Sequence, residues 1–272
     1  MTTKREKSLK PCGIVALLTD FGQADWYVGA MKGAILGIAP KAQIVDITHS
    51  IPPQQILQGA IALEAALSAF PRGTVFCAVV DPGVGTKRRG IAVQTEKYFF
   101  IGPDNGLFTL VMEQARICRV VALEKKGFFR HAVSATFHGR DIFAPCAAHL
   151  ARGIAPDRFG PPITKSVLLD IPKLKRPTPR RLRAPFLYAD RFGNALFRLR
   201  RDDLPSNISP TRLKFSLNRR SLGPLRNTFA DVLPGDPVVY IGSAGYVEVG
   251  VNQGCFWKSK GRTEPAWLSV KW

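Results

Sequence analysis

The first 150 or so residues alternate short apolar runs with segments of helical apolar spacing, and this alternation restricts the fold more than any other feature. Strands are expected at 14–18, 43–47, 74–80, 90–94 and 98–101, and helices at 27–38, 54–70 and 141–152. Strands that alternate with helices are typical of βαβ units. We therefore predict an α/β domain over residues 14–155, with a mostly parallel sheet and flanking helices.

The second half has a different pattern of residues. Seven prolines between residues 156 and 185 prevent a single regular element, and they predict a Pro-rich linker over 156–184. Short strand-like runs separated by Gly and Pro turns then follow at 186–189, 195–199, 213–217, 237–241 and 246–251. This spacing predicts a small all-β, barrel-like domain over 185–272. The basic residues 1–13 are interpreted as a flexible tail rather than a signal peptide.

Composition excludes several classes of protein. Hydrophobic residues make up 46% of the 272 residues, which is typical of a globular chain. No apolar run approaches the roughly eighteen residues that a membrane helix needs, so no membrane contact is expected. The five cysteines are odd in number and have no paired spacing, which favours reduced thiols in the cytoplasm. Neither His nor Cys recurs at ligand spacing, so we expect no metal.

The net charge of +19 is concentrated in one segment. Residues 173–226 contain fifteen Lys and Arg against three acids, which places +12 of the total there. Two interpretations stay open: a solvated basic surface, or a weak contact with nucleic acid such as RNA. The few aromatic residues of the segment do not form the interleaved pattern that base-stacking platforms demand, and this favours the solvated surface.

Polar turns follow several of the predicted strands, at 19–22, 46–49, 81–85 and 102–106. Each alone is typical of structural turns. In an open α/β sheet, however, ligands bind beyond the carboxyl ends of the strands, so several carboxylates at one edge indicate a site. His138, beside a glycine and ahead of a predicted helix, adds an acid–base group. His49 and His149 are expected to be structural.

A series of long motifs runs through the chain in order. They are LLTDFG (17–22), YVGAMKG (27–33), IVDITHSIPP (44–53), FPRGTVFCAVVDPGVGTKRR (70–89), GPDNGL (102–107), TFHGRDIFAP (136–145), DRFGN (190–194) and YIGSAGYVEV (240–249). On these motifs the chain resembles the S-adenosylmethionine hydroxide adenosyltransferase family, which is related to fluorinating and chlorinating adenosyltransferases. The resemblance covers roughly residues 14 to 255. It implies hydrolysis of S-adenosylmethionine to adenosine and L-methionine, without a cofactor.

The resemblance also implies roles for individual residues. Asp81, Arg88 and His138 match the set that holds the attacking water, with Arg88 preferred over its neighbour Arg89. The substrate-binding matches are Asp20 for the ribose hydroxyls, Asp25 and Asp190 near the methionine amino group, Phe192, Asn194 and Phe229 for the adenine side, and Ser243 for the methionine end. Asp25 has an alternative role as the cap of a helix that begins at Trp26.

The chemistry agrees with these residue types. The sulfonium departs as neutral methionine, so the protein must mainly hold an oxygen nucleophile in line with the 5′ carbon. Halide-using relatives are the nearest alternative, but they have tyrosines where this chain has Asp81 and His138, and a carboxylate would repel a halide. The resemblance further implies a homotrimer. In it, the N-terminal domain of one subunit and the C-terminal domain of its neighbour would share each site.

Overall fold

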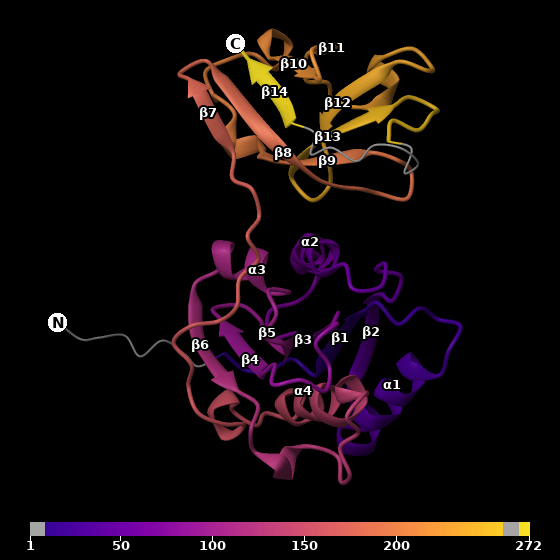
Figure 1. Ribbon diagram of the computed structural model, residues 1–272, viewed down its shortest axis with the longest axis vertical. Coiled ribbons are helices and arrows are strands. Elements are labelled where there is room, and N and C mark those ends of the chain that lie inside the picture. The colour runs from indigo at the N-terminus through magenta and orange to yellow at the C-terminus, as the bar shows by residue number, and fades with distance from the viewer. Residues whose placement is uncertain (1–8, 258–266) are drawn as a thin grey trace, which may run out of the picture. The chain divides into compact units, whose positions relative to one another are not determined.

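The computed structural model describes residues 9–257 and 267–272, and the chain divides into two compact units, Met1–Leu169 and Asp170–Trp272 (Figure 1). The first unit is built on a six-stranded sheet in the order β2-β1-β3-β5-β4-β6. Its strands are β1 (Ile14–Thr19), β2 (Gln43–Thr48), β3 (Val75–Val79), β4 (Gly90–Thr95), β5 (Phe99–Pro103) and β6 (Ile117–Ala122).

The sheet is mixed. β2, β1, β3 and β5 run parallel, as predicted, but β4 is antiparallel to both of its neighbours, β5 and β6. The reason lies in the short connection between β4 and β5. A few residues can join two antiparallel strands, whereas a parallel pair needs a crossover of a dozen residues or more.

Helices cover both faces of this sheet. α1 (Tyr27–Ile38) packs with α4 (Ala144–Ala151) on one face, and α2 (Ile56–Ala66) packs with α3 (Thr109–Gln114) on the other (Figure 1). β3 is buried along its whole length between these layers. A strand covered on both faces is apolar without alternation, which explains why its sequence VFCAV contains no polar residue. The predicted α/β domain is therefore confirmed, with a mixed sheet.

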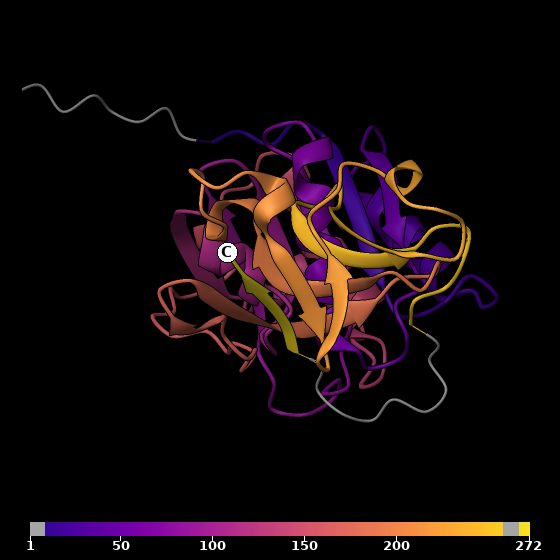
Figure 2. The same cartoon turned by 90° about the horizontal axis from the view of Figure 1, so that it is seen from above.

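The second unit is an antiparallel sheet that approaches a barrel. Its strands are β7 (Lys175–Thr178), β8 (Arg181–Ala189), β9 (Ala195–Arg200), β10 (Lys214–Leu217), β11 (Arg220–Gly223), β12 (Pro237–Ile241), β13 (Tyr246–Val251) and β14 (Trp267–Lys271). The order is β11-β10-β14-β8-β9-β13-β12, with β7 beside β8. Figure 2 shows the strands of this unit curving. The core of the unit includes Phe197, Phe215 and Leu268.

Two prolines of segment 156–184 lie in β-pairings, one in each unit. Pro162 forms a β-bridge with Val121 of β6 in the first unit, and Phe159 is buried there. Farther along, Pro177 lies within β7, which pairs only with β8. Proline is compatible with an edge strand because the missing N–H faces outward. The predicted linker is thus divided between the units, which part after Leu169.

The predicted tail over residues 1–13 falls partly outside the described residues. Its described part lies against the first unit: Leu9 packs on the core, and the Cys12 N–H donates to the Gly73 carbonyl at 3.0 Å. Basic residues at the start of a chain do not prevent such anchoring once an apolar side chain follows them.

Two glycines of the first unit allow a matched test of its packing. A Cβ added at Gly102 in β5 would lie 2.3 Å from the Ala78 carbonyl oxygen, whereas one at Gly37 in α1 meets nothing within 4 Å. We expect Gly102→Ala to lower the free energy of unfolding by about 1–3 kcal/mol. Gly37→Ala should raise it by about 0.5–1 kcal/mol. Urea titration followed by circular dichroism measures both, and equal effects would contradict the packing described for β5.

Candidate active site

The candidate active site of the first unit lies where parallel strands end. Asp20 directly follows β1, and Asp81 follows β3 by two residues. β1 and β3 are parallel neighbours, so their carboxyl ends share one edge of the sheet. His138 reaches the same cluster from another element, because it is the N-cap of the π-helical turn Gly139–Phe143 that leads into α4.

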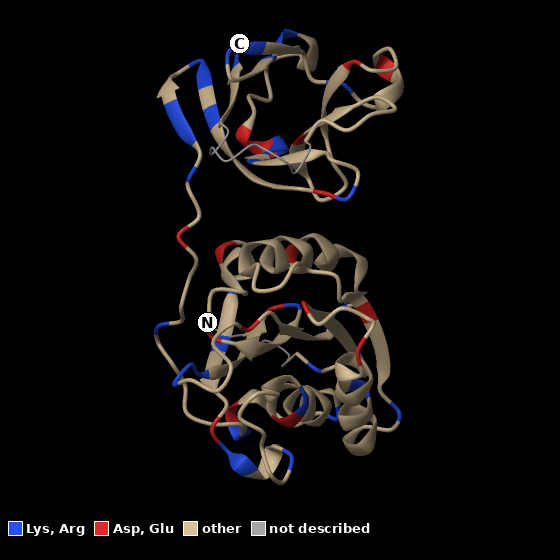
Figure 3. Cartoon of the chain, turned by 45° about the vertical axis from the view of Figure 1, so that its right-hand side comes forward, with Lys and Arg blue, Asp and Glu red and all other residues tan. Residues whose placement is uncertain are grey.

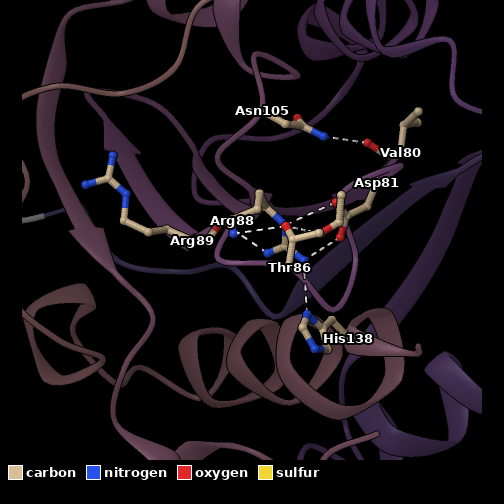
Figure 4. A network of polar contacts seen from close by, with 8 residues as sticks. Val80, Asp81, Thr86, Arg88, Arg89, Asn105 and His138 are labelled. Atoms are coloured by element: carbon tan, nitrogen blue, oxygen red, sulfur yellow. Dashed lines mark hydrogen bonds and ion pairs between the residues drawn. The ribbon is translucent and has the colours of Figure 1, made fainter. Parts of the chain in front are cut away.

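Arg88 joins the two other predicted catalytic residues (Figure 4). Its Nε lies 3.1 Å from Asp81 Oδ1 and its Nη2 lies 2.5 Å from Asp81 Oδ2, so the contact is bidentate. The same Nη2 lies 3.0 Å from His138 Nδ1. A guanidinium has only donors, so His138 Nδ1 must accept and the ring proton of the neutral imidazole lies on Nε2.

The cluster is desolvated. The side chains of Asp81 and Arg88 are 4% and 9% exposed, and the guanidinium lies 5.2 Å from the centre of the Phe143 ring. Burial raises the pKa of the Asp81 carboxyl, and the adjacent Arg88 charge acts in the opposite direction. Burial and then the Arg88 charge lower the pKa of His138. His138 is therefore neutral at neutral pH.

The loop between Asp81 and Arg88 is held by local hydrogen bonds. The Thr86 hydroxyl donates to the Gly83 carbonyl at 2.7 Å, and the Arg88 N–H donates back to that hydroxyl oxygen at 3.2 Å. Gly85 has φ +78°, and a Cβ there would lie 2.6 Å from the Ala135 carbonyl oxygen. Only glycine allows this approach, which brings the Asp81 loop against the segment that carries His138.

The neighbouring Arg89 has a structural role. Its side chain points away from the cluster (Figure 4) and forms an ion pair with Asp104, with Nη2 and Oδ2 2.6 Å apart. Asp104 is buried, and its other oxygen accepts the Val167 N–H at 2.8 Å. Asn105 donates to the Val80 carbonyl at 2.8 Å and so supports the residue before Asp81. Residues of the GPDNGL motif therefore hold Arg89 and the backbone at Val80, on either side of the loop that carries Asp81 and Arg88.

Asp20 is oriented by backbone rather than by another charge. Its Oδ2 accepts the Gln54 N–H at 2.9 Å, and Gln54 has φ +67°. A non-glycine residue in this region is strained, and such strain is found most often at functional sites. Asp25 is exposed, and the helix N-cap is Trp26 with no side-chain capping bond, so the structure gives Asp25 no capping role.

A polar chain behind Asp20, buried at Thr19 and His49, was not singled out from the sequence. Thr19 Oγ1 lies 2.8 Å from His49 Nδ1, and His49 Nε2 lies 3.1 Å from Asp46 Oδ1. Lys32 completes the chain with Nζ 2.6 Å from Asp46 Oδ2. Thr19 Oγ1 also accepts the Phe21 N–H at 3.2 Å, so the chain fixes the backbone on both sides of Asp20. His49 is thus structural, as expected.

The second unit gathers most of its predicted binding residues at one turn. Asp190 Oδ1 accepts the N–H groups of Phe192 and Asn194 at 2.9 and 2.8 Å, and Asp190 Oδ2 accepts the Asn194 side-chain amide at 2.9 Å. Asn194 is buried, whereas Phe192 is 75% exposed at the tip of the turn. A large aromatic side chain held outward on a rigid turn is available for contact with a ligand or another molecule.

Phe229 lies near the same place, because Gly250 leaves room. A Cβ on Gly250 would lie 2.6 Å from Asn194 Oδ1 and 2.8 Å from the Phe229 ring. Phe229 packs on Tyr240, with ring centroids 4.8 Å apart. Ser243 lies apart from them, exposed in the turn between β12 and β13.

Sequence reasoning missed a buried carboxyl beside this turn. Glu248 Oε2 accepts the Tyr240 hydroxyl at 2.6 Å, and burial raises the pKa of Glu248, with nearby Asp190 adding to the shift. Burial raises the pKa of Tyr188, and the nearby carboxylates of Asp190 and Glu248 raise it further. The alternation of polar Glu248 within the apolar run of β13 was the one available signal.

Comparison with known proteins decides the family. Residues 15–160 match the SAM hydroxide adenosyltransferase N-terminal domain and residues 184–261 match the SAM hydroxide adenosyltransferase C-terminal domain. The chain belongs to the SAM hydroxide adenosyltransferase family. This confirms the resemblance drawn from the motifs.

Relatives of this family member span nearly its whole length. An (R)-S-adenosyl-L-methionine hydrolase of Thermus thermophilus is 41% identical over 88% of this chain and 92% of its own length. One from Salinispora tropica is 37% identical over 90% and 93%. A fluorinase of an Actinoplanes species is more distant, at 29% identity over 88% and 91%. The crystal structure of an uncharacterized conserved protein from Thermotoga maritima has a TM-score of 0.87 at 32% identity, covering 95% of this chain and 100% of that one.

Two features are absent from the described part of the chain. Within residues 9–257 and 267–272, no group of three or more His, Cys, Asp or Glu is arranged to hold a metal ion. In the same part of the chain, no helix is both long and apolar enough to cross a membrane.

The lowered pKa of His138 predicts how stability depends on pH. Its folded-state pKa lies below the ordinary value of 6.5, so the unfolded chain binds the proton more readily. His138 should therefore cost stability as pH falls through 6.5, and nothing well above it. We expect His138→Gln to flatten the fall of the melting temperature between about pH 7.5 and pH 5.5. His131→Gln, which changes a histidine outside the cluster, is the control; equal flattening in both would contradict the account.

Proposed function

We propose that this chain hydrolyses S-adenosyl-L-methionine to adenosine and L-methionine. The observation that carries the proposal is the desolvated Asp81–Arg88–His138 cluster, in which one guanidinium contacts both a carboxylate and a neutral imidazole. Its support comes from relatives of up to 41% identity that are named (R)-S-adenosyl-L-methionine hydrolase. The reaction as proposed uses no cofactor, because the sulfonium is itself the leaving group.

The cluster suits the activation of one water. Arg88 would donate to the water oxygen and also hold His138 through Nδ1, and Asp81 would accept a water proton as the remaining lone pair of the oxygen attacks the 5′ carbon. The raised pKa of Asp81 makes the carboxylate a better proton acceptor than an exposed aspartate. The C–S bond breaks as the C–O bond forms, and methionine leaves with the electron pair on sulfur. A charge-assisted donor such as Arg88 holds the developing hydroxide in place.

Asp20 suits the ribose hydroxyls, since two adjacent hydroxyl donors match one carboxylate. The backbone N–H of Gln54 fixes that carboxylate through Oδ2. Further binding roles proposed from the family resemblance are Asp25 and Asp190 at the methionine amino group, Phe192, Asn194 and Phe229 at the adenine, and Ser243 at the methionine end. The hydrogen bonds of Asp190 to the turn at 192–194 support a preformed binding surface.

Adjacent arginines provide a matched test of the proposed function. Arg88→Lys keeps the charge but loses the bidentate fork, and we expect kcat to fall by about 10²-fold or more. Arg89→Lys changes the neighbouring residue, whose partner is Asp104, and should keep most of the turnover. Adenosine is followed by chromatography after incubation with S-adenosylmethionine. Equal losses in both variants would contradict the role given to Arg88.

The same assay tests the halide alternative. Reactions with and without excess chloride should give adenosine at the same rate. A 5′-chloro product that grows with chloride concentration would instead place the chain with the halide-using relatives. The buried Asp81 carboxylate argues against a halide at this position, because the two anions repel.

We also propose the homotrimer implied by the resemblance, with each site shared between subunits. Sedimentation measures the trimer, and complementation tests the sharing. Asp81→Asn and Asp190→Ala are each expected to be nearly inactive alone. Co-expressed in one trimer, they should restore about a quarter of the sites, because a shared site then takes both intact residues from different chains. No recovery from mixed trimers would contradict a shared site.

A cytoplasmic location and a weak nucleic-acid contact through residues 173–226 are further proposals. The odd number of cysteines supports the first. The fifteen Lys and Arg of that segment support the second.

A further inference from the structure

The positive charge of the second unit does not serve the proposed substrate. S-adenosylmethionine carries a positive sulfonium, so a basic surface repels that part of the molecule rather than attracting it. Segment 173–226 nevertheless holds +12 of the net charge. The structure shows where part of this charge lies: on β7, β8 and β14, where Figure 3 shows Lys and Arg without intervening acids.

Strand register gathers these charges on one face, which we call the basic–Trp face: Lys175, Arg181, Arg183 and Lys271 with Trp267. Lys175 pairs with Arg183, and Lys271 pairs with Arg181. All four cations are exposed, while Leu182 and Val270 between them point into the core.

These pairings oppose like charges. Arg181 lies directly across from Lys271, and Lys271 lies across from Lys214 on β10. Like charges opposite each other destabilise a sheet. The segments that form this face, 171–189, 214–230 and 267–272, contain no Asp or Glu to offset the repulsion. A bound polyanion would supply the missing negative charge.

Two tryptophans lie among the cations. Lys175 Nζ is 4.6 Å and Arg183 Cζ is 5.5 Å from the centre of the Trp267 ring, and Arg176 Cζ is 6.0 Å from that of Trp272. Two tryptophans from outside segment 173–226 therefore lie beside its cations. β14 brings indoles from about 90 residues farther along the chain into the basic segment. Cations for phosphates beside aromatic rings for bases are what single-stranded nucleic acid requires.

An anionic membrane is the other polyanionic surface to consider. Membrane-surface proteins insert large apolar side chains between lipid headgroups. Among the described residues of the second unit, the exposed large apolar side chains are Phe192 and Leu233, and neither belongs to β7, β8 or β14. Trp267 and Trp272 are half-buried, and Trp272 packs against the core of the unit. The face lacks the apolar wedge that a lipid surface would need.

We propose that the basic–Trp face binds single-stranded nucleic acid, with phosphates on its Lys and Arg side chains and a base beside Trp267. This inference does not rest on the proposed hydrolase activity. Four phosphate contacts would weaken binding by about 50-fold between about 50 and 200 mM salt. RNA and DNA share the phosphates and bases that the face would recognise, and the experiment distinguishes them.

The test is fluorescence anisotropy of labelled single strands, about 12 nucleotides of poly(U) or poly(dT), with the full-length protein. We expect binding with the stated salt dependence. Lys175→Gln/Arg183→Gln should weaken it by about ten-fold or more, whereas Lys125→Gln/Lys126→Gln, which removes two exposed charges from the first unit, should not. Equal losses in both double variants would mean attraction by net charge alone and would overturn the assigned face.

Trp267→Leu separates stacking from charge. It leaves the charge unchanged and should weaken single-strand binding by roughly ten-fold. Retained circular dichroism and retained adenosine formation show that the variant is folded. Unchanged affinity in this variant, no binding at about 50 mM salt, or preferential binding to phosphatidylserine vesicles would each overturn the proposal. A stronger signal for poly(U) than for poly(dT) would identify RNA as the source of the strand; the reverse would identify DNA.

Discussion

Arg88 holds two partners that differ in charge, and the geometry of the site depends on that contact. Its guanidinium fixes the Asp81 carboxylate through two hydrogen bonds, and Nη2 also donates to His138 Nδ1. Without the guanidinium, burial alone would favour a protonated Asp81. With it, a negative group and a neutral imidazole stay side by side in a desolvated place, which is the arrangement needed to orient and deprotonate water.

The rest of the first unit keeps this contact in register. β3 delivers Asp81, and Gly85 lets its loop approach the segment that leads to His138. Arg89, Asp104 and Asn105 brace the loop from the opposite side. Each of these residues is itself buried or hydrogen-bonded, so the proposed catalytic side chains are held by neighbours with few free rotamers.

Much of this could be predicted from the sequence, and the exceptions have physical causes. The apolar runs and motifs predicted the α/β domain and the clustering of Asp81, Arg88 and His138. The spacing of apolar residues does not indicate the direction of a strand, so it did not predict that β4 runs antiparallel to its neighbours. The spacing also does not indicate which distant residues meet. It therefore did not predict the contact of Lys175 with Trp267 or the hydrogen bond of His49 with Thr19, the residue before Asp20. The binding roles of all the predicted residues stay predictions, and Asp25 and Ser243 are in addition exposed on loops.

The most direct test of water attack at the 5′ carbon is a single turnover in water labelled with oxygen-18, with adenosine analysed by mass spectrometry. The account predicts that the label enters adenosine and lies on its 5′ hydroxyl, while the methionine stays unlabelled. Adenosine that carries no label, or a label recovered in the methionine carboxylate or elsewhere in the products, would contradict an attacking water held by Asp81, Arg88 and His138.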